Sequence, residues 1–499
     1  MTTIEQDAAE RRYPTGEGGT PRGVTVAGLG GGSGKSVVAV GLAAALVRRG
    51  RLVRCFKKGP DYIDAGWLEM AAGRSCCNLD PFLMDEAALR QSFLKHSCGM
   101  ERVVVEGNRG LYDGVNVAGA FSTAELTKSL GLPILLVVDC TKTTRTVAAL
   151  VLGCREFDRQ VRIAGVILNR VGTARHENLV REAVECYTGI PVVGAIRRRR
   201  GDFFPQRHLG VTPAPEHDRA AATVDDLADL AEACLDLDRI ESLMTAIPEA
   251  GGAVAPAPAV QIIGTPVRIG LVRDAAFQFY YPENLEALRD QGAELVEVNA
   301  LRDRGLPPLD GLYIGGGFPE TSIKELSLNI PFRNAVRSVA AAGLPIYAEC
   351  GGLIYLGESM QIDGQDYLLA GVFPVRFDLA QRPQAHGYTI LRVEGDNPFY
   401  QKGTEIKGHE FRYSRPVAWT GQPGALVMKM ERGVGFMEGR DGLVSNNVLA
   451  LYTHIHAVGT PSWATAVVGA ARRYAKEAAR LCSSETRAFL SYDRSAVRE

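Results

Sequence analysis

The sequence has little net charge, no long apolar run and no paired cysteine motif, and each absence excludes a class of protein. Its 56 Lys and Arg residues nearly balance 57 Asp and Glu residues, which gives a net charge of -1. Such a balance creates no field that would attract nucleic acid or an anionic membrane over the whole surface. We therefore expect small-molecule partners, with no nucleic acid and no membrane.

Apolar runs long enough to span a bilayer do not occur in the sequence. The opening MTTIEQDAAERR is polar and acidic, whereas a secretory signal places an apolar segment after a charged one. The ten cysteines include no Cys-x-x-Cys pair, so neither a zinc ribbon nor a disulfide framework is indicated. These features predict a cytoplasmic protein whose cysteines are mostly reduced.

The chain is long enough for two domains, with 499 residues of which 46% are hydrophobic. Residues 1–22 are polar and rich in Gly and Pro, and we expect them to be disordered. Residues 247–266 are rich in Pro, Ala and Gly with almost no charge, which is typical of a linker. We therefore expect domains over 23–246 and 267–475, followed by a C-terminal tail over 476–499.

Apolar runs alternate with helical stretches in the first domain. GVTVAGL, LVRCFK, RVVVEG, PILLVVD and RIAGVILNR are separated by segments such as SVVAVGLAAALVRRG. This rhythm indicates a doubly wound α/β domain, in which helices cover both faces of a parallel sheet. The second domain begins in the same way and later has fewer helices, which predicts an α/β domain with a mixed sheet.

A glycine-rich segment, VAGLGGGSGKS, joins an apolar strand to a helix. Five residues separate Gly28 from Gly34, one more than in the common phosphate loop, which would need glycine in place of Leu29. Small residues let backbone N–H groups surround phosphate oxygens, while Lys35 reaches the terminal phosphates and Ser36 offers its hydroxyl to Mg²⁺. The segment predicts a nucleotide site formed by Gly28, Gly32, Ser33, Gly34, Lys35 and Ser36.

Polar side chains follow further strands, on the rim where open parallel sheets bind ligands. Glu106 ends the strand RVVVE, where an ionised carboxylate is costly without a cation or hydrogen-bond partners, so it is a candidate Mg²⁺ ligand. Asp61 and Asp64 follow CFKKG, and they hold a metal, orient a nucleophile or stabilise a turn. Asn169 ends GVILN and either reads an adenine edge or caps a turn.

A cysteine, a glycine triplet and two histidines indicate a nucleophilic site in the second domain. Cys350 lies between the strand LPIYAE and a Gly-Gly helix start, an elbow that exposes the thiol and favours the thiolate. Backbone N–H groups of residues 315–317 would form an oxyanion hole, and His454 or His456 would take the thiol proton. A buried cysteine with a core histidine is the alternative, but three such features in one predicted sheet favour cysteine catalysis.

Seven segments in this order, FKKGPDYIDAGW, EGNRGLYDG, LNRV, RHLGV, GGGFPE, AECGGLIYL and YTHIH, resemble the glutamine-dependent cobyrinic acid a,c-diamide synthases. The resemblance covers nearly the whole chain from Gly23 to about Ala475, and the longer phosphate loop resembles that of dethiobiotin synthetase. It implies a P-loop synthetase domain of dethiobiotin synthetase type, dependent on ATP and Mg²⁺. The second domain would be a class I glutamine amidotransferase.

The resemblance also implies a mechanism. Cys350 would attack L-glutamine, form a thioester and release ammonia, with His454 as base and no third acid. Ammonia would displace phosphate from an acyl phosphate formed on the a and c acetate arms of a tetrapyrrole polycarboxylate, in a chain that could pair as a homodimer. The roles carried over are catalysis for Asp61; metal binding for Ser36, Asp61 and Glu106; the oxyanion hole for Gly316, Gly317 and Gly351; ATP binding for Asn169; and substrate binding for Lys57, Tyr62, Asp64, Arg207 and His208.

Two segments depart from the corrinoid pattern. QRPQAHGYTI stands where an Arg- and Leu-Gly-Tyr-containing segment is typical, and Asn108-Arg109 stands where small apolar residues are common. These changes resemble members that amidate sirohydrochlorin or sirohaem. The run Arg197–Arg200 would contact the carboxylates of the macrocycle, or it forms a solvated face. A ParA-like ATPase switch with an inactive second domain is an alternative of another class, against which the retained Cys350 argues.

Overall fold

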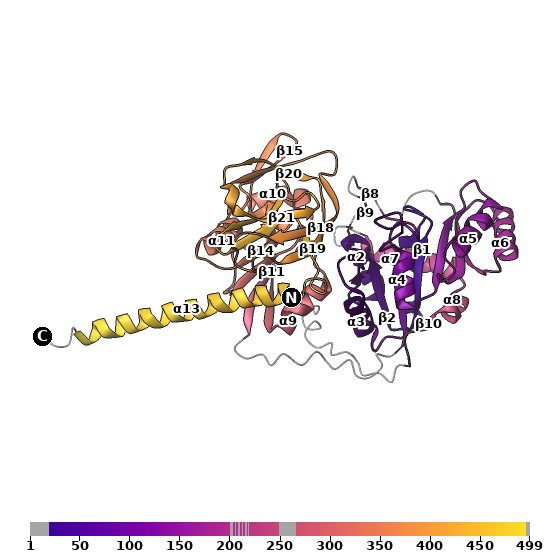
Figure 1. Cartoon of the computed structure of the whole chain (residues 1–499), viewed down its shortest axis with the longest axis horizontal. Coiled ribbons are helices and arrows are strands. Elements are labelled where there is room, and N and C mark those ends of the chain that lie inside the picture. The colour runs from indigo at the N-terminus through magenta and orange to yellow at the C-terminus, as the bar shows by residue number, and fades with distance from the viewer. Residues whose placement is uncertain are drawn as a thin grey trace. The chain divides into compact units, whose positions relative to one another are not determined.

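The structure, a computed structural model, describes residues 19–199, 203–204, 206–207, 210–211, 213–214, 217, 219–248 and 266–495. The chain divides into two compact units, residues 1–256 and 257–499 (Figure 1). This division falls within the linker predicted over 247–266, most of which lies outside the described residues, as do residues 1–18. No described helix is both long and apolar enough to cross a membrane.

The first unit is built on an eight-stranded sheet. Its parallel strands run in the order β3-β2-β4-β1-β5-β6-β7, and β10 pairs antiparallel with β1. A separate two-stranded sheet joins β8 and β9. The strands are β1 Arg22–Gly28, β2 Val53–Lys58, β3 Cys77–Leu79, β4 Arg102–Glu106, β5 Ile134–Asp139, β6 Ile163–Val171, β7 Val192–Arg197, β8 Gln206–Arg207, β9 Gly210–Val211 and β10 Thr245–Ala246.

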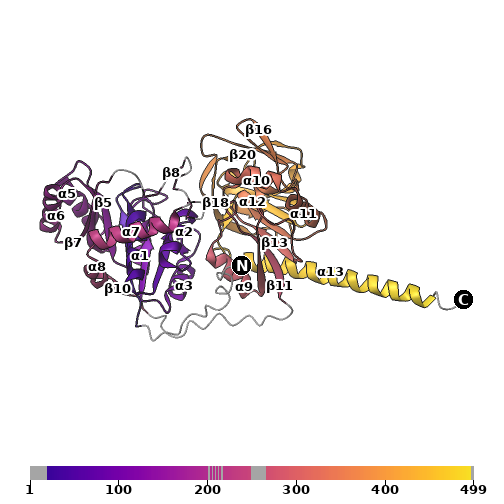
Figure 2. The ribbon, with the colours of Figure 1, turned by 180° about the vertical axis from the view of Figure 1, so that it is seen from behind.

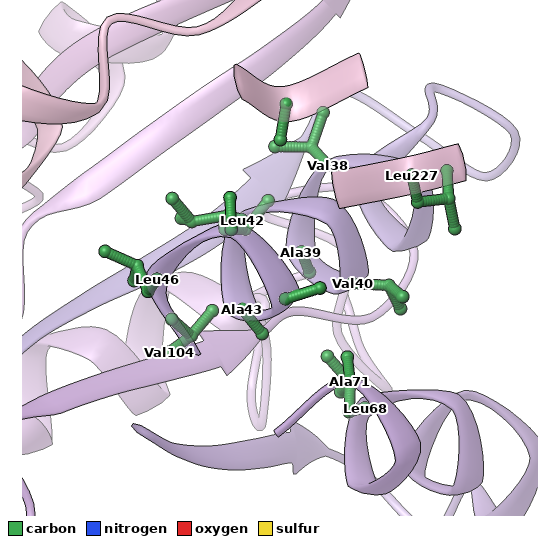
Figure 3. Packing of buried hydrophobic residues seen from close by; sticks show 14 of the residues in the cluster. Val38, Ala39, Val40, Leu42, Ala43, Leu46, Leu68, Ala71, Val104 and Leu227 are labelled. Atoms are coloured by element: carbon green, nitrogen blue, oxygen red, sulfur yellow. The ribbon is translucent and has the colours of Figure 1, made fainter. Parts of the chain in front are cut away.

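Helices cover both faces of this sheet, because its strands are apolar on both sides. One hydrophobic core contains residues of α1, α2 and α7, and another contains residues of α4, α5 and α6. Figure 3 shows Val38, Leu42 and Leu46 of α1 among the side chains of the first core. The helices are α1 Lys35–Arg48, α2 Tyr62–Ala72, α3 Glu86–Ser97, α4 Thr123–Leu130, α5 Thr146–Phe157, α6 Ala174–Thr188, α7 Ala220–Cys234 and α8 Leu237–Leu243.

The second unit is built on a ten-stranded mixed sheet in the order β12-β11-β13-β14-β23-β22-β21-β18-β19-β24. Strands β12 to β23 in this order are parallel, and the remaining pairs are antiparallel. The strands are β11 Val267–Val272, β12 Ala293–Val298, β13 Gly311–Ile314, β14 Ile346–Glu349, β18 Ala385–Val393, β19 Glu405–Arg412, β21 Leu426–Arg432, β22 Arg440–Ser445, β23 Val448–Leu451 and β24 His454–Ile455.

A four-stranded sheet, β16-β15-β17-β20, and five α-helices complete the second unit (Figure 2). The small sheet contains β15 Ser359–Ile362, β16 Gln365–Leu368, β17 Val375–Leu379 and β20 Ser414–Trp419. The helices are α9 Pro282–Asp290, α10 Ile323–Leu328, α11 Ile330–Ala341, α12 Gly351–Leu356 and α13 Ser462–Ser495. A parallel sheet in one unit and a mixed sheet in the other confirm the predicted fold class.

A long helix occupies the C-terminal segment. We expected a helix followed by a tail over 476–499, and α13 runs from Ser462 to Ser495 (Figure 1). The stretch AKEAARLCSSETRAFL contains no glycine or proline and is rich in the strong helix formers Ala, Glu, Arg and Leu. The high helix propensity of these residues accounts for a helix that continues beyond residue 475, where the predicted domain ends.

Candidate functional site

The glycine-rich loop joins β1 to α1 and is tied to a neighbouring strand. Gly34, at the N-terminus of α1, has a φ of 95°. A Cβ at this position would overlap with Nδ2 of Asn169, so glycine is required for space as well as for conformation. The Asn169 amide donates to the carbonyl of Ser33 at 2.8 Å, and its oxygen accepts from the N–H of Arg170 at 2.9 Å. Asn169 thus anchors the loop and caps a turn, and its contact with adenine stays a prediction.

Lys35 and Ser36 begin α1 at the end of this loop. The Lys35 ammonium donates to the carbonyl of Gly30 at 2.8 Å, and burial lowers the pKa of Lys35. The Ser36 hydroxyl donates to Oε1 of Glu106, at the end of β4, at 2.7 Å. The structure therefore brings the predicted phosphate-binding residues together with the predicted metal-binding carboxylate.

Lys57, on β2, balances the negative charge of two carboxylates, those of Asp64 and Glu106. It lies directly opposite Glu106 in the parallel pair of β2 and β4. Its Nζ is 2.6 Å from Oδ2 of Asp64 and 3.2 Å from Oε1 of Glu106. Burial raises the pKa of Glu106 to about 7, although Lys57 opposes this shift. Burial also acts to raise the pKa of Asp64, but attraction to Lys57 outweighs it and the pKa is lowered.

Asp61 caps α2 beside this cluster. Its Oδ1 accepts from the N–H groups of Ile63 at 2.9 Å and Asp64 at 3.1 Å. Burial and the neighbouring Asp64 raise the pKa of Asp61 to about 6. The side chain therefore stabilises a turn, which the sequence left open, and it also lies close enough to Glu106 to raise the pKa of that carboxyl group.

The structure places the predicted substrate-binding residues in different surroundings. The Lys57 side chain is only 1% exposed and is paired with two carboxylates, and its contact with substrate stays a prediction. Tyr62 and Asp64 lie in the first turn of α2, and Arg207 lies in β8. His208 and Arg200 lie outside the described residues. Arg197 and Arg199 line one pocket, together with Arg181 and Glu177.

The carboxylate beside the phosphate loop has one oxygen that is suited to holding Mg²⁺. Among the described residues, no three His, Cys, Asp or Glu side chains gather as a metal site. Glu106 nevertheless has its buried Oε2 without a hydrogen-bond partner, next to the Ser36 hydroxyl. Mg²⁺ commonly uses one or two protein oxygens and takes its other ligands from water and phosphates, so these residues fit it.

Cys350 forms the elbow between β14 and α12. Its φ is 47° and its ψ is -98°, a strained conformation for a residue other than glycine. Its N–H donates to the carbonyl of Leu451 at 2.8 Å, which fixes the elbow against β23. The residue is 6% exposed, and its side chain interacts with that of His454.

His454 begins β24, two intervening residues after the end of β23, and lies beside the elbow. Its Nδ1 lies 3.6 Å from Oε2 of Glu349, and its ring stacks on that of His409 with 4.9 Å between centroids. Burial lowers the pKa of His454, but interactions with Cys350 and Glu349 outweigh it and raise the value to about 10. A protonated His454 beside Cys350 is the arrangement that a cysteine nucleophile requires.

His456 belongs to a different cluster. Its Nε2 lies 3.7 Å from Oε2 of Glu283, and its ring packs on Tyr281 with 4.5 Å between centroids. Asn284 holds the segment between the histidines, donating to the carbonyl of Ile455 at 2.8 Å and accepting from the N–H of residue 457 at 2.6 Å. Of the two candidates, the geometry therefore favours His454 as the base.

The predicted oxyanion glycines surround the same elbow. A Cβ on Gly316 would overlap with the His454 ring, so the two residues are in close contact. A Cβ on Gly351 would lie 3.1 Å from the backbone nitrogen of Gly317. The N–H of Gly352 is engaged with the carbonyl of Gly315 at 3.1 Å. Gly316, Gly317 and Gly351 thus lie near the elbow at Cys350, and their role as an oxyanion hole stays a prediction.

Sequence reasoning missed Glu349, because it looked for a third acid after His454 and not before Cys350. The signal was present, since Glu349 ends an apolar strand, LPIYAE, as Glu106 ends RVVVE. A charged residue at such a position is buried at a cost and calls for a partner.

Comparisons with known proteins match both units. A model of the CobQ/CobB/MinD/ParA nucleotide binding domain matches residues 24–209, and one of the CobB/CobQ-like glutamine amidotransferase domain matches residues 268–461. The chain is 44% identical over 437 residues to the cobyrinate a,c-diamide synthase of Magnetococcus marinus, covering 87% of this chain and 93% of that relative. It is 40% identical over 446 residues to that of Methanothermobacter thermautotrophicus, covering 88% and 97%. It is 38% identical over 456 residues to that of Archaeoglobus fulgidus, covering 91% and 97%.

Proposed function

Since the chain belongs to the cobyrinate a,c-diamide synthase family, we propose that it uses ATP and glutamine to convert the a and c acetate carboxylates of cobyrinate into amides. The observation that carries this proposal is the presence of two sites of different chemistry in one chain. One is a phosphate loop beside buried carboxylates, and the other is a cysteine at a strained elbow beside a histidine. Cytoplasmic ATP and glutamine would supply both.

The first unit activates the substrate. A carboxylate does not accept ammonia at neutral pH without a better leaving group, so an acyl phosphate must form first. Lys35 exchanges its bond to the Gly30 carbonyl for the terminal phosphates of ATP, and the loop N–H groups hold the remaining phosphate oxygens. Ser36 and Glu106 would hold Mg²⁺, which neutralises phosphate charge when bound. Asp61 and Asp64 orient the substrate carboxylate at the start of α2.

The second unit releases ammonia from glutamine. The Cys350 thiolate attacks the carboxamide carbon, and the N–H groups of Gly316, Gly317 and Gly351 donate to the oxyanion. His454 gives its proton to the departing ammonia, which leaves a thioester that water hydrolyses to glutamate. The ammonia then attacks the acyl phosphate, and phosphate departs as the amide forms.

Two other functions are less well supported. Sirohydrochlorin and sirohaem carry similar acetate arms, but the relatives compared are named for cobyrinate. A ParA-like switch would not need an interacting cysteine and histidine in the second unit, and this chain retains both.

One assay tests the proposal. Purified protein is incubated with ATP, Mg²⁺ and glutamine, separately with cobyrinate, sirohydrochlorin and sirohaem, and the products are read by mass spectrometry. We expect two replacements of OH by NH₂ on cobyrinate. Conversion of sirohydrochlorin or sirohaem instead would move the protein to another substrate, and no conversion with any of the three would refute amidation.

Two variants separate the sites. Cys350→Ala should abolish amidation from glutamine and retain it with ammonium salts. Lys35→Ala should abolish amidation from either nitrogen donor and retain glutamine hydrolysis. Equal loss with both donors in Cys350→Ala, or amide formation by Lys35→Ala, would contradict the assigned roles.

A further inference from the structure

A buried carboxylate lies against the side of His454 that faces away from the thiol. Glu349 is fully buried, and its Oε2 lies 3.6 Å from Nδ1 of His454. The same oxygen accepts from the Tyr313 hydroxyl at 3.3 Å, and Oε1 accepts from the N–H of Ile455 at 3.4 Å. The carboxylate is thus held between β13, β14 and β24 and directed at one ring nitrogen.

We propose that Glu349 is the positioning residue of the glutaminase site, orienting the His454 ring through Nδ1 and stabilising its protonated form. This inference rests on the proposed function, in which Cys350 and His454 hydrolyse glutamine. Glu349 does the work of a third acid, although it precedes the cysteine in the chain and does not follow the histidine.

The geometry assigns different tasks to the two ring nitrogens. With Nδ1 facing a carboxylate, the neutral ring carries its proton on Nδ1, and Nε2 is left as the acceptor for the thiol. The positive φ of Cys350 allows two consecutive residues, Glu349 and Cys350, to interact with the same histidine, which an extended strand would prevent by directing them to opposite faces.

The energetics of burial support an interaction and not mere proximity. An ionised carboxylate in a protein interior is costly unless it is paired and hydrogen-bonded. Burial raises the pKa of Glu349, whereas attraction to the nearby His454 and hydrogen bonds from Ile455 and Tyr313 act against this shift. The protonated His454 supplies the opposite charge, so carboxylate and imidazolium stabilise each other.

A second histidine–glutamate pair in the same unit provides an internal comparison. His456 and Glu283 lie 3.7 Å apart, nearly as close as His454 and Glu349. His454 is the histidine whose pKa is raised through both a glutamate and Cys350. The thiol contact therefore distinguishes the Glu349–His454 pair.

The test is the alkylation rate of Cys350 by iodoacetamide at pH 9, measured for the full chain by mass spectrometry of the Cys350 peptide. An opposite charge shifts a pKa by about 1 to 3 units, so Glu349→Gln should lower the pKa of His454 from about 10 toward about 8. At pH 9 this change should slow alkylation about tenfold, because less of the imidazolium beside the thiol remains. A carboxylate that acted on the sulfur alone would repel the thiolate, and Glu349→Gln would then speed alkylation. An unchanged or faster rate would overturn the proposal.

A double-mutant cycle separates positioning from general damage to the fold. In a His454→Ala background, Glu349→Gln should leave the alkylation rate unchanged, because its effect passes through the ring. Equal slowing in both backgrounds would overturn the proposal. Glu349→Asp should restore part of the rate lost in Glu349→Gln.

Tyr313→Phe provides a second route if Glu349→Gln does not fold. It removes a donor to the carboxylate and keeps the ring, so it should slow alkylation in the same direction by about two- to threefold. No slowing in this variant would count against the proposal. Alkylation needs no cobyrinate and no ATP, so a wild-type chain that made no amide would refute the proposed function while leaving the Glu349 result readable.

Discussion

Gly316→Ala places a methyl group against the ring of His454 and tests whether the position of that ring controls catalysis. The added Cβ would lie 3.1 Å from Nδ1 and 3.2 Å from Nε2 and would overlap with Cε1, whereas real Cβ atoms keep at least 3.0 Å. The ring would have to retreat by about 1 Å, and a misplacement of this size costs ~100-fold in rate. We expect kcat for glutamine hydrolysis to fall by about that factor.

The assay follows glutamate release from glutamine and, separately, amide formation from ammonium salts. Amidation with ammonium should stay near the wild-type rate, because the methyl group lies in the glutaminase unit. Gly305→Ala is the matched control, since a Cβ there meets nothing within 4 Å. A Gly316→Ala protein that hydrolyses glutamine at the wild-type rate would show that the close contact with His454 does not govern the reaction.

Three further outcomes are expected. Lys57→Met leaves Asp64 and Glu106 without their buried cation and should lower the free energy of unfolding of the first unit by about 3–5 kcal/mol. Urea denaturation followed by Trp67 fluorescence measures this change. Arg159→Met, which removes a surface ion pair, is the control and should change the free energy of unfolding by no more than about 0.5 kcal/mol. Burial lowers the pKa of His454, but Cys350 and Glu349 raise it from 6.5 to about 10. Protonated His454 therefore contributes stability that is fully present below about pH 6.5 and is lost as the pH rises through about 10. The difference in unfolding free energy between wild type and His454→Gln, followed by Trp419 and Trp463 fluorescence, should shrink over this interval, and a constant difference would contradict the shift. His456→Ala should retain more glutamine hydrolysis than His454→Ala, and the reverse order would move the base by two residues.

Local patterns in the sequence were sufficient for the architecture and for most of the loop chemistry. The strand runs predict the parallel sheet, and the small residues before Lys35 predict a turn between β1 and α1, because both depend on neighbours along the chain. The elbow at Cys350 is predicted for the same reason, and the structure gives it a positive φ.

Contacts between side chains on different strands could not be predicted from local sequence patterns. Lys57 meets Glu106 because β2 and β4 pair in one particular register, which no local pattern specifies. The proximity of Glu349 and His454 likewise depends on the pairing of β14 with β23 and on the two residues that lead into β24. The sequence therefore suggested a ligand contact for Lys57, and the register of β2 shows in addition that it is a buried counter-ion of Glu106 and Asp64.

The direct pairing of β14 with β23 brings together two reactive groups that are far apart in the chain. The backbone hydrogen bond from Cys350 to Leu451 closes a loop that contains the whole of the small sheet and the strands β18, β19, β21 and β22. Insertions or deletions among those hairpins can change the rim of the domain without altering the spacing of thiol and imidazole. Evolution could therefore reshape this excursion for a new neighbour or ligand while the ammonia-producing chemistry stayed constant.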